Sequence, residues 1–364
     1  MNVLIDINHP AHVHLLKNVY FALKEHGHQV YVVVKDIPSA KELMDKYGIP
    51  YIQIGEKNDK LIIKGLEQII YDIKIWWFCI CHHIEIGVGS SINIAHVSKL
   101  CRMKSIILDD DDDEVEPLFT KFAHPFCNVI LSPDCITRKA KQTIGYPAYH
   151  DLAYLHPNRF KPDANVLKEV GIKEGETFFI LRFNAFKAHH DIRAEGLNNK
   201  NKHNLVNLLN KYGKVLITTE RGIDEDFKPY QIHISPNKIH SLMYYATMFI
   251  GDSQSMTSEA AVLGTPAIKC NSFAGRLAVP NEIEDKYDLC YCFIPNNVDE
   301  MFAKIDDLLK RKTLKIEWKE KVQKMLVDKI DVTAFLIWFI EHYPASAEEA
   351  RTKKDDKIFW QQFK

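Results

Sequence analysis

The chain has 364 residues, of which 46% are hydrophobic and 26% charged, with 47 Lys and Arg against 48 Asp and Glu. This length suffices for two domains with separate cores, and the balanced charge gives no overall field that would favour nucleic acid. Eight scattered cysteines without a Cys-x-x-Cys pair, and the lack of a signal peptide, indicate reduced thiols in the cytoplasm.

The first half alternates short apolar runs with helical segments. Strands are expected at residues 2–7, 29–34, 51–54, 84–87, 105–108, 129–131 and 145–147. A loop at 8–12 should follow the first strand and lead into a helix from about Val13, with further helices at 40–47 and 92–101. Such alternation is typical of a parallel sheet covered on both faces.

Residues 61–81 form the most apolar stretch, but Lys64, Glu67, Asp72 and Lys74 interrupt it before it reaches the length that spans a bilayer. Its isoleucines and tryptophans recur at helical spacing. We interpret it as a buried helix followed by the start of a strand. The alternative is a peripheral membrane contact, which fits only a lipid-linked substrate.

The second half repeats the pattern. Strands are expected at residues 178–182, 214–218, 233–234, 248–250 and 266–269, and helices at 203–212, 239–245, 298–309 and 316–327. A linker at 157–163 divides an N-terminal Rossmann-like domain (1–160) from a C-terminal one (161–340), and a tail (341–364) should pack back on the body. We therefore predict an α/β fold of two doubly wound domains facing across a cleft, with ligands at the carboxyl ends of the strands.

The turn after residue 250 has the chemistry of a phosphate site. A helix N-terminus offers free N–H groups and a positive dipole end, and Glu259, one turn further, could accept from a sugar hydroxyl. The alternative is an ordinary Ser/Thr helix cap. The residues expected to bind a nucleotide sugar here are Asp252, Ser253, Gln254, Ser255, Met256, Thr257 and Glu259.

The first strand-to-helix turn carries His9, His12 and His14. Histidine titrates near neutral pH, so His9 or His12 could act as a general base that deprotonates an acceptor hydroxyl. The alternative is that one or two of these rings cap the helix or pack as neutral groups. His14 should lie on the helix and is the weakest candidate.

A second polar segment follows the strand at 178–182. Arg182 and Lys187 would supply fixed positive charge to a leaving diphosphate. His189 and His190 could add donors; with Asp191 they also resemble a metal cluster, but adjacent histidines rarely chelate one ion. We expect phosphate recognition and no metal.

An acidic run begins at Asp109, directly after a strand. Asp109 and Asp110 are candidates for acceptor binding, together with Asn8 of the first turn and Gly89 and Ser90 of a Gly-x-Gly turn. A solvated loop is the commoner role of such a run, and Mg²⁺ is another use of paired carboxylates. The spacing of Cys79, Cys81 and the two histidines after them suits a metal poorly.

These motifs together resemble domain-of-unknown-function family 354, whose members are regarded as glycosyltransferases related to UDP-N-acetylglucosamine 2-epimerases. The resemblance covers nearly the whole chain and rests on the segments 6–14, 182–191, 251–260 and 263–273. It implies a GT-B fold that binds its donor mainly in the C-terminal domain, through an Asp-Ser diphosphate motif and a later ribose-binding Glu. Gln254 and Ser255 replace the two glycines of that motif.

The resemblance implies a glycosyltransferase of surface polysaccharide or glycoconjugate synthesis, with a nucleotide-sugar donor, a sugar or lipid-linked glycan acceptor and no cofactor. The alternatives are a 2-epimerase or hydrolase of nucleotide sugars and a non-catalytic binding protein. The Arg-Pro-Glu, Gly-Asp-Thr and Glu-Ala-Gly motifs of 2-epimerases have no one-to-one match here. His9-Pro10-Ala11, Gly87-Val88-Gly89-Ser90 and the acidic run stand in their places. The expected location is the cytoplasm, at the inner membrane face if the acceptor is lipid-linked.

Overall fold

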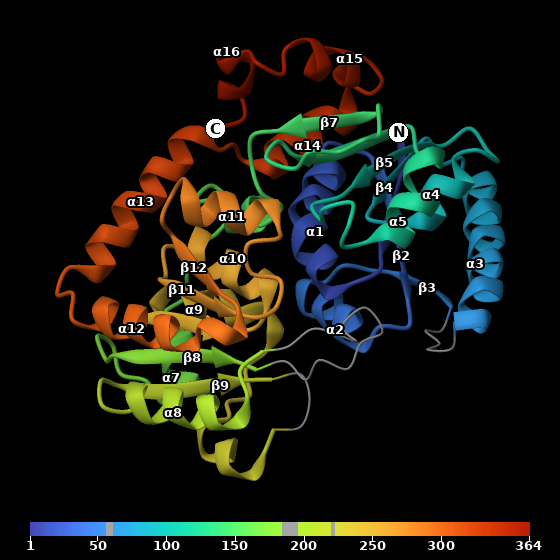
Figure 1. Ribbon diagram of the computed structural model, residues 1–364. Coiled ribbons are helices and arrows are strands. Elements are labelled where there is room, and N and C mark those ends of the chain that lie inside the picture. Colours follow the sequence, from blue (N-terminus) through green and yellow to red (C-terminus); the bar gives the residue numbers. More distant parts are fainter. Residues whose placement is uncertain (56–60, 184–195, 220–222) are drawn as a thin grey trace. The chain divides into compact units, whose positions relative to one another are not determined.

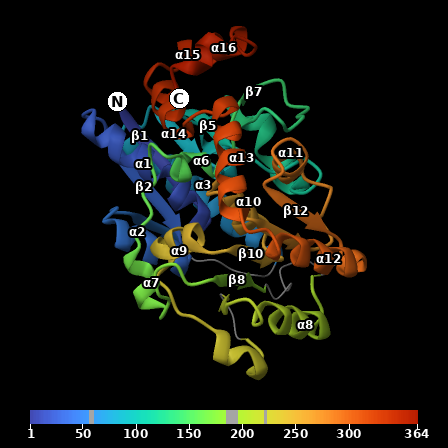
Figure 2. The same ribbon diagram turned by 90° about the vertical axis from the view of Figure 1, so that its left-hand side faces the viewer.

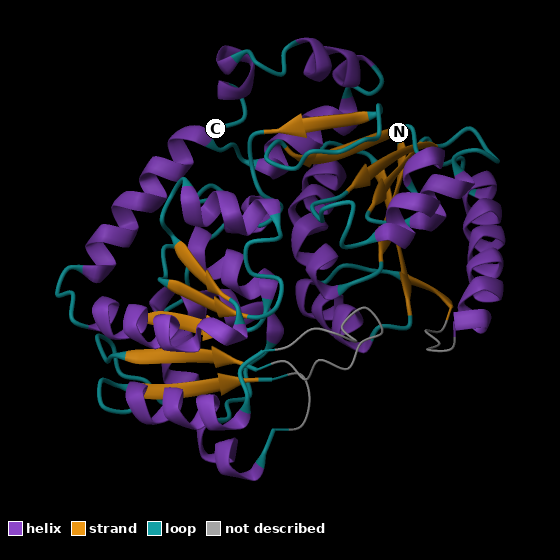
Figure 3. Ribbon diagram, viewed as in Figure 1, coloured by secondary structure: helices purple, strands orange, loops and turns teal. Residues whose placement is uncertain are grey.

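The computed structural model describes residues 1–55, 61–183, 196–219 and 223–364, with the backbone alone for residues 61–66. The chain forms two compact units: residues 1–159 with 329–364 make unit 1, and residues 160–328 make unit 2. Each unit contains one parallel sheet (Figure 3). The chain is therefore an α/β protein, as the alternating sequence pattern predicts.

Unit 1 has a seven-stranded sheet in the order β3-β2-β1-β4-β5-β6-β7 (Figure 1). Its strands are β1 (Asn2–Ile7), β2 (Gln29–Lys35), β3 (Ile52–Gly55), β4 (Ile86–Gly89), β5 (Lys104–Leu108), β6 (Val129–Pro133) and β7 (Thr143–Tyr146). The helices before residue 160 are α1 (Pro10–Glu25), α2 (Pro38–Tyr47), α3 (Leu61–Cys81), α4 (Ile92–Val97), α5 (Pro117–Phe122), the 3₁₀ helix η1 (His124–Phe126) and α6 (Leu152–Leu155). The order reverses between β1 and β4, which marks the switch point of a doubly wound sheet.

Alternation along the strands places apolar side chains on both faces of this sheet. Leu4 of β1 packs in a cluster with Ile75 of α3 and Ile94 of α4. The next residue, Ile5, faces Val13 of α1 on the other side. Both faces are thus covered by helices, which is why the strands read as nearly continuous apolar runs.

The C-terminal segment returns to unit 1 as α14 (Val332–Glu341), α15 (Ala345–Thr352) and α16 (Lys357–Gln361). Phe335 is fully buried and its ring lies 5.4 Å from that of Tyr146. Thr333 Oγ1 donates to the Ala153 carbonyl at 2.7 Å. Residues 329–340, which the sequence assigned to the second domain, therefore belong to unit 1.

Unit 2 has a five-stranded sheet in the order β12-β11-β10-β8-β9 (Figure 1 and Figure 2). Its strands are β8 (Phe178–Arg182), β9 (Lys214–Thr218), β10 (Met248–Gly251), β11 (Ala267–Cys270) and β12 (Cys290–Phe293). The α-helices are α7 (Asn165–Glu169), α8 (Asn199–Leu209), α9 (Ile239–Tyr245), α10 (Gln254–Val262), α11 (Ala278–Asp285), α12 (Val298–Leu309) and α13 (Leu314–Asp328), and the 3₁₀ helices are η2 (Glu225–Tyr230), η3 (Pro236–Lys238) and η4 (Pro295–Asn297). The switch point lies between β8 and β10.

Three local expectations were wrong. No strand forms at 233–234 among the described residues; a single bridge joins Ile217 to Gln231, and Pro229 and Pro236 favour 3₁₀ turns around it. Residues 61–81 are one helix without a terminal strand. The first helix begins at Pro10 instead of Val13, because proline suits the first helical position and His9 caps it. His12 therefore lies on the helix.

Candidate functional site

Three residues stand in register at the carboxyl end of the unit 2 sheet, beside its switch point. Gly251 of β10 pairs with Arg182 of β8 on one side and with Lys269 of β11 on the other. Residues in register on adjacent strands point to the same face of a sheet. Two cationic side chains therefore flank a position that has no side chain.

Glycine is required at the centre of this row. A Cβ at Gly251 would lie 2.6 Å from the Arg182 carbonyl oxygen and 3.1 Å from the Arg182 Cβ atom. The backbone N–H of Asp252 then donates to the Arg182 carbonyl at 3.2 Å. The close approach of β8 and β10 fixes where the chain turns into α10.

Lys269 is fully buried, and its ammonium donates to the side-chain oxygen of Gln254, the first residue of α10. Among the described residues, no carboxylate oxygen lies within 4.0 Å of this ammonium. The charge of Glu284 acts on it only from beyond that distance. A buried cation that forms no close ion pair is costly, and the positive end of a helix dipole adds to that cost. A bound anion would relieve both.

The first turn of α10 leaves its N–H groups available to such an anion. Ser253 is the N-cap and its hydroxyl accepts from Met256 N at 3.4 Å, whereas the N–H groups of Gln254 and Ser255 have no acceptor within the helix. Ser253, Gln254 and Met256 are half-buried and Ser255 is exposed. Four of the predicted binding residues thus surround a helix N-terminus that has cations beside it.

The other predicted residues of this motif face the protein interior. Thr257 is buried and donates to the Ser253 carbonyl at 2.7 Å. Asp252 is buried, and its carbonyl accepts from the Asn271 side chain at 2.9 Å. Glu259 is buried as well, with a carboxylate oxygen 3.0 Å from His240 Nε2. His240 contacts only one carboxylate oxygen of Glu259, so a ribose hydroxyl would have to reach this buried carboxylate beside the histidine.

Lys187, His189 and His190, the remaining predicted residues of this site, lie outside the described residues. Lys269 was missed by the sequence reasoning. The available signal was a lysine inside the apolar strand that follows the Gly-Thr-Pro turn, where a charge is out of place.

A second polar cluster lies at the switch point of unit 1, where β1 and β4 end. Asp6 is fully buried, and one of its carboxylate oxygens accepts from Ser91 Oγ. Burial raises the pKa of Asp6, although the charge of Lys35 and the Ser91 hydrogen bond oppose the rise. A Cβ at Gly89 would lie 2.6 Å from the Asp6 carbonyl oxygen, so this predicted residue serves the close approach of two strands.

Polar atoms without a hydrogen-bond partner collect in the same region. In the part of the chain that the structure describes, Asp6 Oδ1 and Asn8 Oδ1 are both buried and have none. Ser90 Oγ, by contrast, donates to the Leu108 carbonyl at 2.5 Å. Asn8 therefore keeps an acceptor that a bound hydroxyl could use, while the hydroxyl of Ser90 is engaged in the fold.

The two predicted catalytic histidines both use Nδ1 to accept a backbone N–H. His9 Nδ1 accepts from Ala11 N at 3.2 Å, and His12 Nδ1 accepts from Asn8 N at 3.3 Å. A neutral ring that accepts at Nδ1 carries its proton on Nε2. Burial lowers the pKa of His12 to about 3, with a further contribution from His9. His12 is therefore a neutral hydrogen-bond donor at physiological pH.

His150, which the sequence reasoning missed, has the opposite arrangement. Its Nδ1 lies 3.1 Å from Asp110 Oδ1, while its buried Nε2 has no hydrogen-bond partner among the described residues. Although desolvation alone would raise it, the pKa of Asp110 is held below its ordinary value by the charge and hydrogen bond of His150. In the neutral form of His150, an ionised Asp110 keeps the ring proton on Nδ1, so Nε2 carries the lone pair. The sequence signal was a histidine shortly after the last apolar strand of the first domain.

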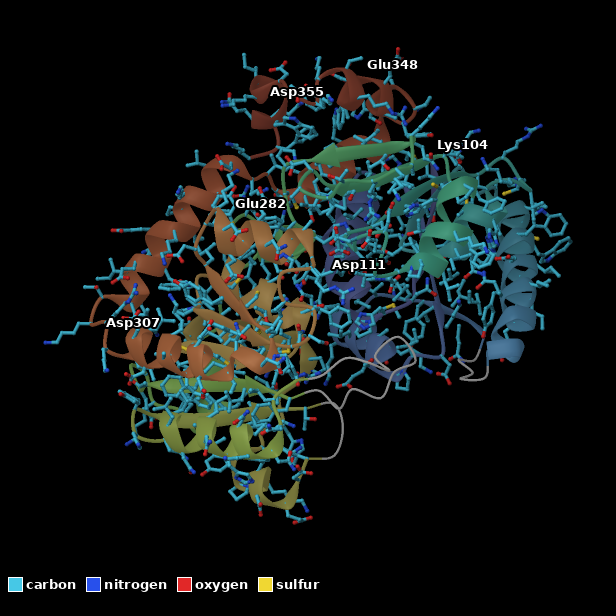
Figure 4. All side chains as sticks on the ribbon, in the orientation of Figure 1. Lys104, Asp111, Glu282, Asp307, Glu348 and Asp355 are labelled. Carbon is cyan, nitrogen blue, oxygen red and sulfur yellow. The ribbon has the colours of Figure 1, made fainter. Side chains whose placement is uncertain are left out.

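Two other carboxylates of the acidic run, Asp109 and Asp113, are held in ion pairs within the fold. The guanidinium of Arg138 contacts Asp109 at 2.9 Å and Asp113 at 2.8 Å, and His124 Nε2 lies 2.8 Å from the second oxygen of Asp109. Asp109 is buried, whereas Asp110 and Asp111 are exposed (Figure 4 labels Asp111). Of the two predicted acceptor-binding carboxylates, only Asp110 lies open. Among the described residues no group of three metal-ligating side chains is found.

Two doubly wound units define the GT-B architecture, and solved structures share it across nearly the whole chain. S. aureus MnaA, in a co-structure with UDP, gives a TM-score of 0.66 at 9% identity and covers 95% of this chain and 97% of its own. The UDP-GlcNAc 2-epimerase of Methanocaldococcus jannaschii gives a TM-score of 0.63 at 13% identity, and the match covers 86% of this chain and 94% of the epimerase. The spinosyn rhamnosyltransferase SpnG, in complex with spinosyn aglycone, gives a TM-score of 0.58 at 11% identity, and the match covers 90% of this chain and 97% of SpnG. At these identities the similarity establishes the fold.

The chain belongs to the family described as "Protein of unknown function (DUF354)", whose model matches residues 1–334. This confirms the family resemblance of the sequence. No curated protein matches the chain in a sequence comparison.

Replacing Lys269 by Met should separate stability from anion binding. Removing a buried cation that forms no close ion pair should leave the free energy of unfolding unchanged or higher, whereas UDP and pyrophosphate should bind about tenfold more weakly. Chemical denaturation and calorimetric titration measure the two effects. Lys319→Met, at an exposed lysine of α13, is the matched control. A less stable Lys269→Met variant with unchanged affinity would make the lysine structural.

The neutral state of His12 predicts a loss of stability in acid. The unfolded chain protonates this ring near pH 6.5, but the native chain does so only near pH 3. Stability should therefore fall as the pH drops below about 6.5, by on the order of 1–2 kcal/mol at pH 5. Urea unfolding at pH 7.5 and pH 5 should show a smaller difference in His12→Gln than in the wild type. His233→Gln, at an exposed histidine, should keep the wild-type difference; equal pH dependence in all three proteins would refute the assignment.

Proposed function

We propose that the protein is a glycosyltransferase that moves a sugar from a nucleotide-diphosphate donor to a hydroxyl acceptor, in surface polysaccharide or glycoconjugate synthesis. The observation that carries this proposal is the row of Arg182, Gly251 and Lys269 at the N-terminus of α10. A leaving nucleoside diphosphate develops negative charge, and fixed cations with helix N–H groups stabilise it. The GT-B fold and the UDP named with one structural relative are consistent with such a donor.

In this proposal the diphosphate sits on the first turn of α10. The N–H groups of Gln254 and Ser255 and the hydroxyl of Ser253 would bind phosphate oxygens, while Arg182 and Lys269 neutralise them. Glu259 would bind a ribose hydroxyl beside His240, and Lys187, His189 and His190 are retained as predicted donors to the nucleotide sugar.

Unit 1 would supply acceptor binding and proton transfer. An acceptor hydroxyl must lose its proton as the new glycosidic bond forms, so a base is needed. His150, oriented by ionised Asp110, offers a lone pair on Nε2. His12 would donate Nε2–H to a substrate oxygen, and Asn8 Oδ1 would accept from a hydroxyl. His9 and His12 as bases stay predictions, against which the Asp110–His150 pair competes.

A second candidate function is epimerisation of the nucleotide sugar itself, because several of the structural relatives are named UDP-GlcNAc 2-epimerases. Both functions need the same donor site, so the row of Arg182, Gly251 and Lys269 does not distinguish between them. The lack of matching 2-epimerase motifs in the first domain favours transfer. The acceptor is then a sugar or a lipid-linked glycan.

A panel of nucleotide sugars tests the proposal. UDP-, GDP-, CDP- and dTDP-sugars are added with and without Mg²⁺, and the melting temperature is followed because a ligand of the native state raises it. One donor should give a shift that needs no Mg²⁺ and should release its nucleoside diphosphate when acceptor is present. Conversion of that donor into its epimer without acceptor, followed by NMR, would favour the second candidate. No shift with any donor would contradict both.

His150→Gln should lower turnover about 10²- to 10⁴-fold, the usual contribution of a general base, while donor affinity stays unchanged. Asp110→Asn should act in the same direction, because a neutral partner no longer fixes the tautomer. Initial rates and donor titration measure both effects. His96→Gln is the matched control, since its ring also pairs with an aspartate, Asp72, at 2.8 Å. Full activity in His150→Gln together with loss of activity in His9→Gln or His12→Gln would instead identify a histidine of the first turn as the general base.

A further inference from the structure

Helix α3 is apolar on two opposite faces. Tyr71, Ile75 and Cys79 recur every fourth residue, are buried, and face the interior of unit 1. On the opposite side, Ile69 is 57% exposed, Ile73 57% and Trp77 62%. An ordinary surface helix carries polar residues there, so the outward side of α3 calls for a separate explanation. The helix lies at the edge of unit 1 (Figure 1).

The exposed apolar surface continues onto the neighbouring elements. Trp76 Nε1 of α3 donates to the carbonyl of Leu100, which is 64% exposed. His96 of α4 contacts the Phe122 carbonyl at 2.9 Å and the ring of Phe126 at 5.0 Å. We call this surface the α3 patch; it consists of Ile69, Ile70, Ile73, Trp77, Ile80, Leu100, Phe122 and Phe126, all exposed. Large apolar side chains exposed on neighbouring elements in this way are typical of an interaction surface.

Exposed cations border the α3 patch. The turn that carries Leu100 also carries Lys99 and Arg102, and Lys104 begins β5 directly after it. All three cations are exposed, and the chain has no acidic residue between residues 98 and 104 (Figure 4 labels Lys104). At the far side, Lys121 Nζ lies 5.5 Å from the centroid of the Phe122 ring. The chain as a whole is electrically balanced, so this concentration of positive charge is local.

We propose that the α3 patch binds the surface of a bilayer that contains anionic lipids. Tryptophan and aliphatic side chains suit the boundary between headgroups and acyl chains, and lysine and arginine beside them attract anionic headgroups. The helix would lie in the plane of the interface, since no described helix is long and apolar enough to cross a membrane. A protein partner for this surface would require matching acidic groups, whereas an anionic bilayer supplies them without a specific fit.

The proposal depends on the α3 patch alone and not on the proposed transfer. If the acceptor is lipid-linked, membrane binding would also bring the enzyme to it. The two proposals can fail separately, because vesicle binding is measured without nucleotide and the thermal shift is measured without vesicles.

Flotation of the full-length protein with vesicles tests membrane binding. Vesicles of phosphatidylcholine alone are compared with vesicles in which anionic phosphatidylglycerol replaces part of the phosphatidylcholine. The wild type should float with the anionic vesicles and at least several-fold less with the neutral ones, and high salt should reduce binding. The Ile73→Glu/Trp77→Glu variant should stay at the bottom, and Lys99→Glu/Lys121→Glu should lose the preference for anionic lipid.

The matched control is Ile316→Glu/Val327→Glu, which changes two apolar side chains of α13 that are 61% and 68% exposed. This control should float like the wild type, and all variants should keep the wild-type melting temperature, since the substituted groups are exposed. Absence of wild-type flotation on either vesicle would overturn the proposal. So would a wild-type dimer that Ile73→Glu/Trp77→Glu dissociates in sedimentation without any vesicle binding, because the patch would then bind a second copy of the chain.

Discussion

The close approach of two parallel strands at each switch point is the constraint on which both candidate sites depend. In unit 1 a Cβ at Gly89 would lie 2.6 Å from the Asp6 carbonyl oxygen, and in unit 2 a Cβ at Gly251 would lie 2.6 Å from the Arg182 carbonyl oxygen. Each glycine ends the strand beside the switch point, so the missing side chain lets the next turn start close to the neighbouring strand. The polar groups of that turn then come to one place.

Each site also buries an ionisable group that forms no close ion pair among the described residues. The Lys269 ammonium has a neutral amide as its partner, and the Asp6 carboxyl is fully buried with a raised pKa. Neither arrangement is expected to increase stability, because desolvation of an ionisable group opposes folding. Arg138, with Asp109 and Asp113 around it, shows how the same chain compensates buried charge where the role is structural. Close ion pairs around a buried charge thus mark the structural framework, and their absence marks the two candidate sites.

Hydrophobic periodicity was enough to predict the parallel α/β class and most strands, because both faces of each sheet are covered and the strands are nearly continuous apolar runs. It was not enough for α3, whose two apolar sides gave the same pattern as a buried helix. The phosphate-binding turn after residue 250 was predicted from the order of neighbouring residues in the sequence. Lys269 and His150, by contrast, contact Gln254 and Asp110, which lie 15 and 40 residues away along the chain. Such pairings depend on strand order, which a single sequence does not provide. The linker at 157–163 also gave no sign that residues after 328 return to unit 1.

The histidines of unit 1 show why residue type alone does not assign a role. The three rings differ in what Nδ1 contacts, which is a backbone N–H in His9 and His12 and a carboxylate in His150. The first kind of contact leaves a donor at Nε2, and the second leaves an acceptor. With Asn8 Oδ1 as another acceptor, unit 1 offers both halves of a hydrogen-bonding set. A hydroxyl both donates and accepts, so it can satisfy one group of each kind, whereas a carboxylate or phosphate could use only the donors. The balance in unit 1 therefore suits a sugar hydroxyl, and the cationic row of unit 2 suits a phosphate.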